Sequence, residues 1–250
     1  MASYLKSSSS GIMRCCILVT MVTSALACMC QPSHPQQQYC KANFVLTGHV
    51  LEKNPIDDIQ LRGRFGQFEY VINVDKIFKE NENLKKGASG FPLSILTSPG
   101  DSLCGPKSLK IGTKYLIAGS VVDGELHISA CDWIQEWRDV TQQQKKGIKN
   151  FYSAYCSQCT IQSTMGGFRQ NTGGGTAGGC IYDPAPSMVN GVEDCQALYA
   201  TCIIQQGQAC QWYHRGNDYQ DCISRNKPYY HGVETTQSVN FPILDDDVMT

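Results

Sequence analysis

The cysteines constrain this chain more than any other feature. The sequence holds 14 of them in 250 residues, and two, Cys15 and Cys16, fall in a leader segment, which leaves 12 in the rest of the chain. An even number of cysteines in a secreted chain indicates a disulfide framework. The competing interpretation is a structural zinc site at Cys156 and Cys159, but no second pair follows at zinc-ribbon spacing. We therefore expect all 12 to be paired with one another.

Residues 1–27 have the pattern of a secretory signal peptide. Lys6 and Arg14 supply the positive charge, residues 15–26 form an apolar run, and Ala25 and Ala27 make a small-x-small cleavage signal. A transmembrane helix would need about 20 apolar residues, which this run does not reach. The pattern predicts cleavage before residue 28 and a secreted, extracellular product.

The charge of the remaining chain excludes some classes of partner. Residues 28–250 carry 19 Lys and Arg against 22 Asp and Glu, a net charge of −3, and the basic residues are scattered among acids. Nucleic-acid and membrane-surface binding both favour a concentrated basic surface. We expect neither partner, and we expect a monomer.

Five short segments between residues 41 and 131 predict the strands of a small all-β domain: 44–51, 68–78, 91–96, 115–122 and 125–131. Residues 68–78 alternate, and five apolar residues are expected on one face: Phe68, Tyr70, Ile72, Val74 and Phe78. Asp123 and Gly124, between the last two segments, predict a type I′ hairpin. Five strands in about 90 residues favour a closed barrel, because closure removes exposed strand edges.

A helix is predicted after the barrel. Thr141 and Gln144 have the spacing of a capping box, and lysines follow toward the end where the helix dipole favours cations. The helix is expected to reach Phe151 and to end before Cys156.

The chain changes character from Cys159 onward. Six cysteines occur in 64 residues, and residues 166–179 include seven glycines, which favours little regular structure held by crosslinks. The glycine run lacks the Lys-Ser/Thr of a phosphate-binding loop and is interpreted as a flexible loop. The division predicted is a barrel domain at 28–156, a small disulfide-rich subdomain at 157–230 and a flexible acidic tail at 231–250, which contains three consecutive aspartates, 245–247.

No catalytic constellation can be assigned. The five histidines, at 34, 49, 127, 214 and 231, do not form a metal-ligand motif, and Gly-x-Ser-x-Gly does not occur. A thiolate nucleophile would lack a free sulfur if the cysteines are paired. His127 falls on the polar side of its predicted strand and is interpreted as a surface histidine. We predict that the protein is not an enzyme and has no cofactor of its own.

The first residue after cleavage has chemistry of its own. A free α-amine at Cys28 would have a pKa near 7.7–8.0, so a useful fraction is uncharged at neutral pH. With the carbonyl oxygen of the same residue it forms a compact chelate, which could replace the water on a protease's catalytic zinc. Disulfides at Cys28 and Cys30 would hold the terminus and direct Met29 outward into an apolar pocket. The competing interpretation is that these cysteines only staple the end of a small domain.

Several sequence blocks occur together in one known family. Cys28-x-Cys30 directly follows the cleavage site, with Pro32, His34-Pro35-Gln36 and Cys40 after it. Further blocks are SLCG at 102–105, YLIAGSVVDGELHISACDW at 115–133, Trp137, QQKKGIKNFYSAYCSQC at 143–159 and CQWYHRG at 210–216. In these blocks the chain resembles the tissue inhibitors of metalloproteinases.

This resemblance implies a mainly β fold, with an N-terminal five-stranded OB-fold barrel of the netrin-like type, flanking helices and a small disulfide-rich C-terminal subdomain. It implies three bridges in the barrel domain: Cys28–Cys104, Cys30–Cys131 and Cys40–Cys156. It also implies a wedge that enters a protease cleft, with Cys28 on the target's zinc: Cys28, Met29, Cys30, Gln31, Pro32, Ser102 and Leu103. Met29 replaces the Thr or Ser usual in the family, and residues 45–49 lack the basic side chains of many members.

The C-terminal pairing is left with two alternatives. Matching the CQWYHRG block implies Cys159–Cys210, Cys195–Cys202 and Cys180–Cys222. Matching by order implies Cys159–Cys222, Cys180–Cys195 and Cys202–Cys210. Six cysteines allow 15 pairings, so spacing alone does not decide.

The function implied is inhibition of secreted zinc metalloproteinases of the matrix type, by chelation of the target's zinc and filling of its cleft. The alternative is a non-inhibitory netrin-like module that acts in matrix assembly or signalling. The resemblance also suggests that the C-terminal region docks on the non-catalytic domain of a pro-protease.

Overall fold

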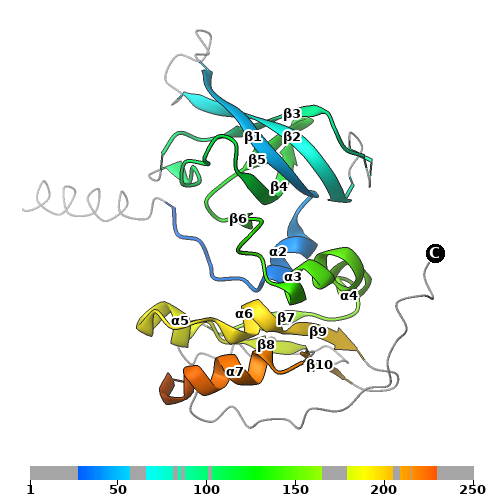
Figure 1. The fold of residues 1–250 in the computed structure, drawn as a ribbon, viewed down its shortest axis with the longest axis vertical. Coiled ribbons are helices and arrows are strands. Elements are labelled where there is room, and N and C mark those ends of the chain that lie inside the picture. The colour runs from blue at the N-terminus through cyan, green and yellow to red at the C-terminus, as the bar shows by residue number, and fades with distance from the viewer. Residues whose placement is uncertain are drawn as a thin grey trace, which may run out of the picture.

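The computed structural model describes residues 28–56, 66–80, 84–85, 88–100, 103–164, 179–204, 209–214 and 216–229. Four predicted features lie outside these residues in whole or in part: the signal peptide at 1–27, Ser102, most of the glycine run and the acidic tail. None of the helices in the described part is long and apolar enough to span a bilayer. Figure 1 shows a β-rich part, a layer of helices beneath it and a second group of short strands and helices.

Five strands form a closed ring at the N-terminal end of the chain: β1 (Phe44–Ile56), β2 (Gln67–Lys79), β3 (Pro92–Thr97), β4 (Lys114–Val122) and β5 (Glu125–Ile128). Their order is β1-β2-β3-β5-β4, and β1 also pairs with β4, which closes the ring. All pairs are antiparallel except β3 with β5. The mainly β fold and the five-stranded OB-type ring are therefore confirmed, and each predicted strand segment overlaps an observed strand.

The β4–β5 hairpin has the predicted turn. Val122 pairs with Glu125, and both central residues have a positive φ, 52° at Asp123 and 84° at Gly124. Two positive φ values are what a type I′ turn requires. β5 is shorter than predicted, and a further short strand, β6 (Ile134–Glu136), pairs with β4 beyond the end of β5.

The interior of the ring is an apolar core. Its buried members come from all five strands and include Phe44, Ile72, Ile95, Ile117 and Ile128. Burial of side chains of this size stabilises a fold by about 1.5–3 kcal/mol each. This core fixes the ring that carries the loops described below.

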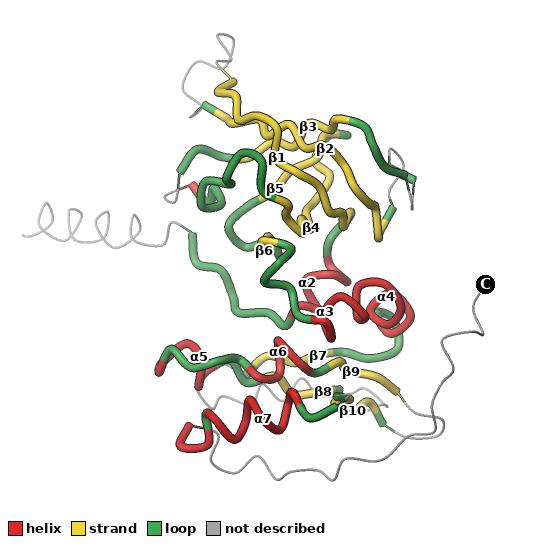
Figure 2. The backbone as a smooth tube through the Cα atoms, in the orientation of Figure 1, coloured by secondary structure: helices red, strands yellow, loops and turns green. Residues whose placement is uncertain are grey.

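The helices lie beneath the ring (Figure 2), and a second apolar core packs between them and the outside of the ring. The helices are α2 (Pro35–Lys41), α3 (Gln142–Lys146), a π-helical turn (Gly147–Phe151) and α4 (Tyr152–Tyr155). Thr141 caps α3 in a capping box with Gln144, as predicted. Gly147 is required at the π-turn, because a Cβ there would lie 2.3 Å from the buried ring of Tyr152.

One predicted face was wrong. Phe78 was expected to share a face with Tyr70, Ile72 and Val74, but it packs in the second core while Ile77 enters the ring interior. The β1–β2 pairing shifts register twice at this end of β2. Each bulge adds one unpaired residue and reverses the side-chain alternation that follows.

In the C-terminal region, residues 157–229, the described residues form short elements. Its strands are β7 (Ile161–Ser163), β8 (Cys180–Tyr182), β9 (Thr201–Ile204) and β10 (Cys210–Tyr213), which form two two-stranded sheets. Its helices are α5 (Ala185–Asn190), α6 (Cys195–Tyr199), α7 (Asp218–Arg225) and a 3-10 turn (Lys227–Tyr229). The core here is largely sulfur: Cys159, Cys180, Cys202 and Cys210 form one buried cluster.

The structure pairs the cysteines as Cys28–Cys104, Cys30–Cys131, Cys40–Cys156, Cys159–Cys210, Cys180–Cys202 and Cys195–Cys222. The first four are pairs that the family resemblance implied. The implied pairs Cys195–Cys202 and Cys180–Cys222 are wrong, and so is the whole alternative by order.

The reason for this correction is topological. Cys195 begins α6, which packs against α7 and so meets Cys222. Cys180 on β8 and Cys202 on β9 meet in the cysteine cluster. Cys202 lies opposite Trp212 in the β9–β10 ladder, not opposite Cys210, which excludes their pairing.

Candidate functional site

The N-terminal strip, residues 28–33, runs outside the ring without regular secondary structure and ends at α2. Two disulfides hold its first part, and Met29 lies between them with 77% of its surface exposed. The strip contains no charged side chain. An uncharged edge with one protruding thioether is suited to an apolar cleft on another protein.

The two disulfides end on loops that are joined to each other. The Ala130 amide donates to the Cys104 carbonyl at 2.7 Å, which joins the segments that bear Cys104 and Cys131. The turn around Cys131 is closed by Asp132, whose carboxylate accepts from the amide and hydroxyl of Ser129 at 2.7 and 2.8 Å. The strip is thus clamped at two points to loops that are bonded to each other.

The loop before Cys104 lies against the strip. The Cα atoms of Cys28 and Cys104 are 5.2 Å apart, which brings half-buried Leu103 beside the first residue of the strip. Gly105 is required, because a Cβ there would lie 2.2 Å from the Ser98 carbonyl oxygen. Cys104 has a φ of 60°, a strained value for a non-glycine residue. Of the residues predicted for this edge, Cys28 to Pro32 and Leu103 come together, and Ser102 lies outside the described residues.

His34 holds the other end of the strip. It caps α2, with Pro35 in the first turn, and its buried ring reaches the C-terminal region, where Nε2 lies 3.0 Å from the Gln196 carbonyl. Burial lowers the pKa of His34 to about 4. In the sequence, His34 and Gln36 were noted only as parts of a motif and Gln37 was not singled out, so the contacts of all three with the C-terminal region were missed.

The sulfurs of this edge are not metal ligands of the chain. Cys28, Cys30 and Cys131 have sulfur atoms within 4.8 Å of one another, a spacing that could hold an ion if the thiols were free. All three are disulfide-bonded, and a disulfide sulfur is not the thiolate that zinc prefers.

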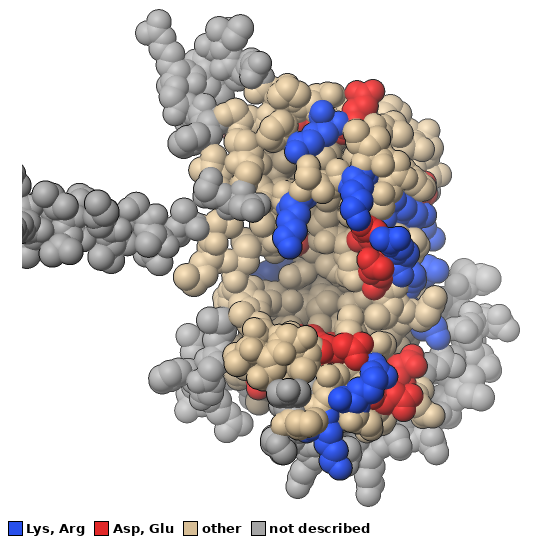
Figure 3. Space-filling view, turned by 60° about the vertical axis from the view of Figure 1, so that its left-hand side comes forward, with Lys and Arg blue, Asp and Glu red and all other residues tan. Residues whose placement is uncertain are grey.

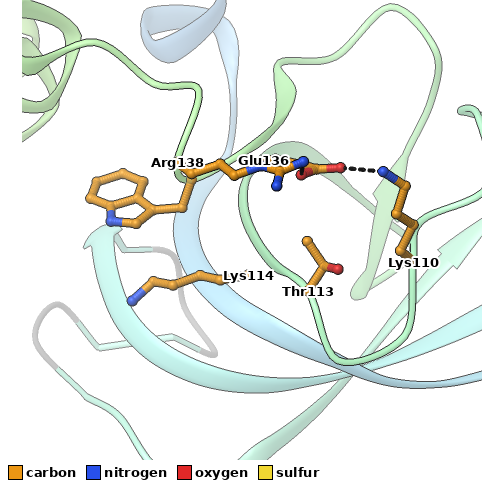
Figure 4. Close-up of a pocket in the computed structure, with 6 residues that line it drawn as sticks. Lys110, Thr113, Lys114, Glu136 and Arg138 are labelled. Atoms are coloured by element: carbon orange, nitrogen blue, oxygen red, sulfur yellow. Dashed lines mark hydrogen bonds and ion pairs between the residues drawn. The ribbon is translucent and has the colours of Figure 1, made fainter.

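A surface cleft of about 450 Å³ lies elsewhere, beside β4 and β6 (Figure 4), and is lined by Lys110, Thr113, Lys114, Glu136, Trp137 and Arg138. Glu136 pairs with Lys110 at 2.8 Å and with Arg138 at 2.7 Å, and the hydrogen bond from Lys110 lowers the pKa of Glu136. Lys114 pairs with Asp75 at 2.8 Å. The three cations are already compensated, and the lining holds no nucleophile beside a base, so the cleft does not form an active site.

The charged side chains on one face of the molecule form two groups. Figure 3 shows most of the Lys and Arg side chains of this face over the β ring, with Asp and Glu among them, a smaller group of both signs lower down, and a hollowed, largely uncharged zone between the two groups. His127, on the ring, is half-buried and lies 3.9 Å from the Glu125 carboxylate, as befits a surface histidine.

Comparison with known proteins adds the decisive observation. Residues 26–212 match the family model described as tissue inhibitor of metalloproteinase. The chain belongs to this family. Its members are inhibitors and not enzymes, as predicted. The match ends before α7, so the helix that carries Cys222 lies outside it.

Relatives from several vertebrates match most of this chain in sequence. Metalloproteinase inhibitor 3 of Scyliorhinus torazame is 28% identical over 201 residues, which are 75% of this chain and 81% of the relative. Metalloproteinase inhibitor 2 of Homo sapiens is 28% identical over 216 residues, 79% and 86% of the two chains. Metalloproteinase inhibitor 3 of Gallus gallus is 28% identical over 194 residues, 76% and 82%.

Proposed function

We propose that this protein is secreted, begins at Cys28 after cleavage, and inhibits secreted zinc metalloproteinases in the extracellular space or matrix. The α-amine nitrogen and the carbonyl oxygen of Cys28 chelate the target's zinc and take the position of its water. Without that water the protease has no activated nucleophile. The inhibitor has no cofactor of its own and shares the zinc of its target.

One observation carries this proposal: a strip clamped by the disulfides of Cys28 and Cys30 to two loops that are hydrogen-bonded to each other, with Met29 exposed between the two clamps. Ordering a free chain end on binding would cost about 1–2 kcal/mol per residue. A strip that is fixed before binding avoids most of this cost. The chelating atoms are then presented in one arrangement.

The rest of the wedge fills the cleft around the zinc. Met29 enters an apolar specificity pocket beside the metal, since an unbranched thioether adapts to such a pocket. Gln31 and Pro32 continue along the cleft on one side, and Ser102 and Leu103 enter from the other. These residues exclude water and set the preference among proteases.

The test compares three forms of the secreted chain: one that starts at Cys28, one with a single alanine added before it, and one acetylated at the amine. We expect the inhibition constant to rise at least about 1000-fold in the two blocked forms, because the amine can no longer bind the metal. N-terminal sequencing checks the first residue, and the unfolding midpoint checks that folding is unchanged.

Equal inhibition by all three forms would contradict the chelation mechanism. If the chain starting at Cys28 fails to inhibit any of a panel of purified metalloproteinases, a netrin-like module acting in matrix assembly or signalling becomes the better description. Docking of the C-terminal region on the non-catalytic domain of a pro-protease is a separate proposal, and deletion of residues 231–250 tests it.

A further inference from the structure

Several side chains of the N-terminal region form hydrogen bonds with the C-terminal region. Side chains on α2 and α3 bind backbone and side-chain atoms of the C-terminal region, at distances of 2.6–3.4 Å: Gln37 to Ile161, Thr141 to Leu198, Gln143 to Thr201 and Gln144 to Ala197. Gln36 makes two such bonds, because its amide both donates to the Cys202 carbonyl and accepts from the Cys202 amide, each at 2.8 Å. We call this set, with His34, the polar seam. Hydrogen bonds depend on exact geometry, so a seam of this kind aligns the two regions.

His34 is the one member of the seam that can change its charge near neutral pH. Its Nδ1 accepts from the Gln36 backbone amide at 3.2 Å, and its Nε2 lies 3.0 Å from the Gln196 carbonyl oxygen. A backbone amide only donates and a carbonyl only accepts. Both contacts are therefore satisfied only by the neutral ring with its proton on Nε2.

The surroundings of the ring disfavour a cation. The His34 ring is fully buried and packs on Tyr182 and Trp212, with centroids 5.4 and 4.8 Å away. It also lies at the N-terminus of α2, where the exposed amides carry partial positive charge. Protonation would place an N–H on Nδ1 against the Gln36 N–H and would remove the cap.

The titratable groups on the elements packed around the ring do not offset this cost. Those elements are α2, α6, β8 and β10. They carry Tyr39, Lys41, Tyr182, Tyr199 and Tyr213 and, at their ends, Asp183, Asp194 and His214, whose ring packs on Tyr219. Asp194 accepts from the Tyr182 hydroxyl at 2.6 Å and from the Ala197 amide at 2.9 Å, so its carboxylate is already engaged. Asp183 is exposed. Burial is the larger influence on the pKa of His34, and the bond to Gln196 opposes it only in part.

His34 also fixes one end of the N-terminal strip. The strip is fixed at one end by the disulfides of Cys28 and Cys30, and at the other by the cap that His34 forms on α2. Gln37 closes the same cap by accepting from the His34 amide at 2.9 Å. Between these ends lie Gln31, Pro32 and Ser33, the part of the strip that no disulfide holds.

We propose that His34 is a positioning residue: its neutral ring locks the N-terminal strip onto the C-terminal region, and its protonation releases the lock, so that inhibition weakens in acid. The inference rests on the proposed inhibitory function. The C-terminal region then contributes to inhibition by holding the strip through the polar seam.

The expected pH range follows from the direction of the shift. A histidine released from the seam has a pKa near 6.5, against about 4 in the folded protein, so acid favours the released state between these values. The equilibrium between locked and released states changes up to tenfold per pH unit, which bounds the effect at about 30-fold at pH 5. At pH 7 and above the lock is complete.

The experiment compares inhibition constants of the full-length wild type and His34→Asn from pH 7.5 to pH 5, against one metalloproteinase that is active throughout. Asparagine keeps the cap acceptor but does not titrate. The ratio between the two inhibitors cancels the protease's own pH dependence. We expect the wild-type constant to rise at least about threefold more than that of the variant. His127→Asn, which removes a half-buried histidine outside the seam, should follow the wild type.

Hydrogen exchange on the free inhibitor measures the lock without a protease. The Gln36 and Cys202 amides should exchange faster at pH 5 than at pH 7.5 in the wild type, after correction for intrinsic rates, but not in His34→Asn. If that variant does not fold, His34→Gln, whose amide can donate to Gln196, takes its place. Parallel pH profiles and equal exchange would overturn the inference. A wild type that inhibits at no pH would instead contradict the proposed function, and unchanged exchange protection would contradict the lock.

Discussion

The two regions of this inhibitor are held together by different means. The N-terminal region has two apolar cores, one inside the ring and one under the helices, and its bridges at Cys28 and Cys30 lie outside both. In the C-terminal region the buried cluster is built of cysteines, with only a few apolar side chains against it. The comparison teaches that disulfides serve two purposes in one chain. In the first region they position a surface strip, and in the second they replace a core that short elements cannot supply.

The largest expected effect on stability is in the ring. Phe44→Ala removes a fully buried ring from the interior core and should lower the free energy of unfolding by about 4 kcal/mol. Phe68→Ala, at a half-buried position on the neighbouring strand, is the matched control and should cost clearly less. Denaturant unfolding measures both. Equal losses would mean that the ring interior is not the main source of stability.

Removal of a C-terminal bridge should come next. The double variant Cys195→Ser and Cys222→Ser opens a link between α6 and α7 that spans 27 residues, and should cost about 3 kcal/mol. The loss should be confined to the C-terminal region. Hydrogen exchange should rise across residues 179–229 while protection of β1 and β4 persists. A uniform loss of protection would show that the two regions unfold as one unit.

These two predictions concern the strands, most of which could be predicted from the sequence, and the C-terminal disulfides, which could be predicted only in part. The strands were predictable because alternation and the Asp123-Gly124 turn are local signals. The reversed face of Phe78 was not, because bulges follow from pairing with β1. The predicted pairing of Cys195 with Cys202 was wrong for a related reason. The two are close in sequence, but they lie on elements that pack against different partners and so bond to Cys222 and Cys180.

The candidate site around the N-terminal strip was also predictable only in part. The clamp at Cys28 and Cys30 was implied by a sequence motif next to a cleavage signal. The polar seam was not predictable, since glutamines such as Gln36 and Gln143 are usually exposed and nothing local indicates that they are buried here. The hydrogen bond from Ala130 to Cys104 joins loops that are distant in sequence and involves only backbone atoms, so no side-chain pattern could reveal it.

Acid should weaken the contact between the two regions. The loss of stability should be smaller than for Phe44→Ala or for the double cysteine variant. The pKa of His34 is about 4 in the folded protein and near 6.5 when unfolded, so its contribution is complete above pH 6.5 and is lost as the pH falls toward 4. At pH 5 the loss should be about 2 kcal/mol. Burial raises the pKa of Asp194, so protonation of that residue favours the folded state in acid and works against the loss. Unfolding free energies of wild type and His34→Asn between pH 7 and 5 separate the two, and a variant as acid-sensitive as the wild type would contradict the assignment to His34.

The smallest effect on stability should come from Met29, whose side chain protrudes from the N-terminal strip. Met29 is 77% exposed between two bridges, so Met29→Gly should change the free energy of unfolding by less than about 1 kcal/mol. The same change should weaken inhibition across a protease panel, because glycine leaves the specificity pocket empty. Met188→Gly on α5 removes another exposed methionine, 59% exposed, and should leave inhibition unchanged. Unchanged inhibition constants for Met29→Gly would show that the clamp presents only the chelating atoms. Comparable losses for both variants would show that the protease contacts α5 as well, and the strict division between a positioning N-terminal region and a stapled C-terminal one would then fail.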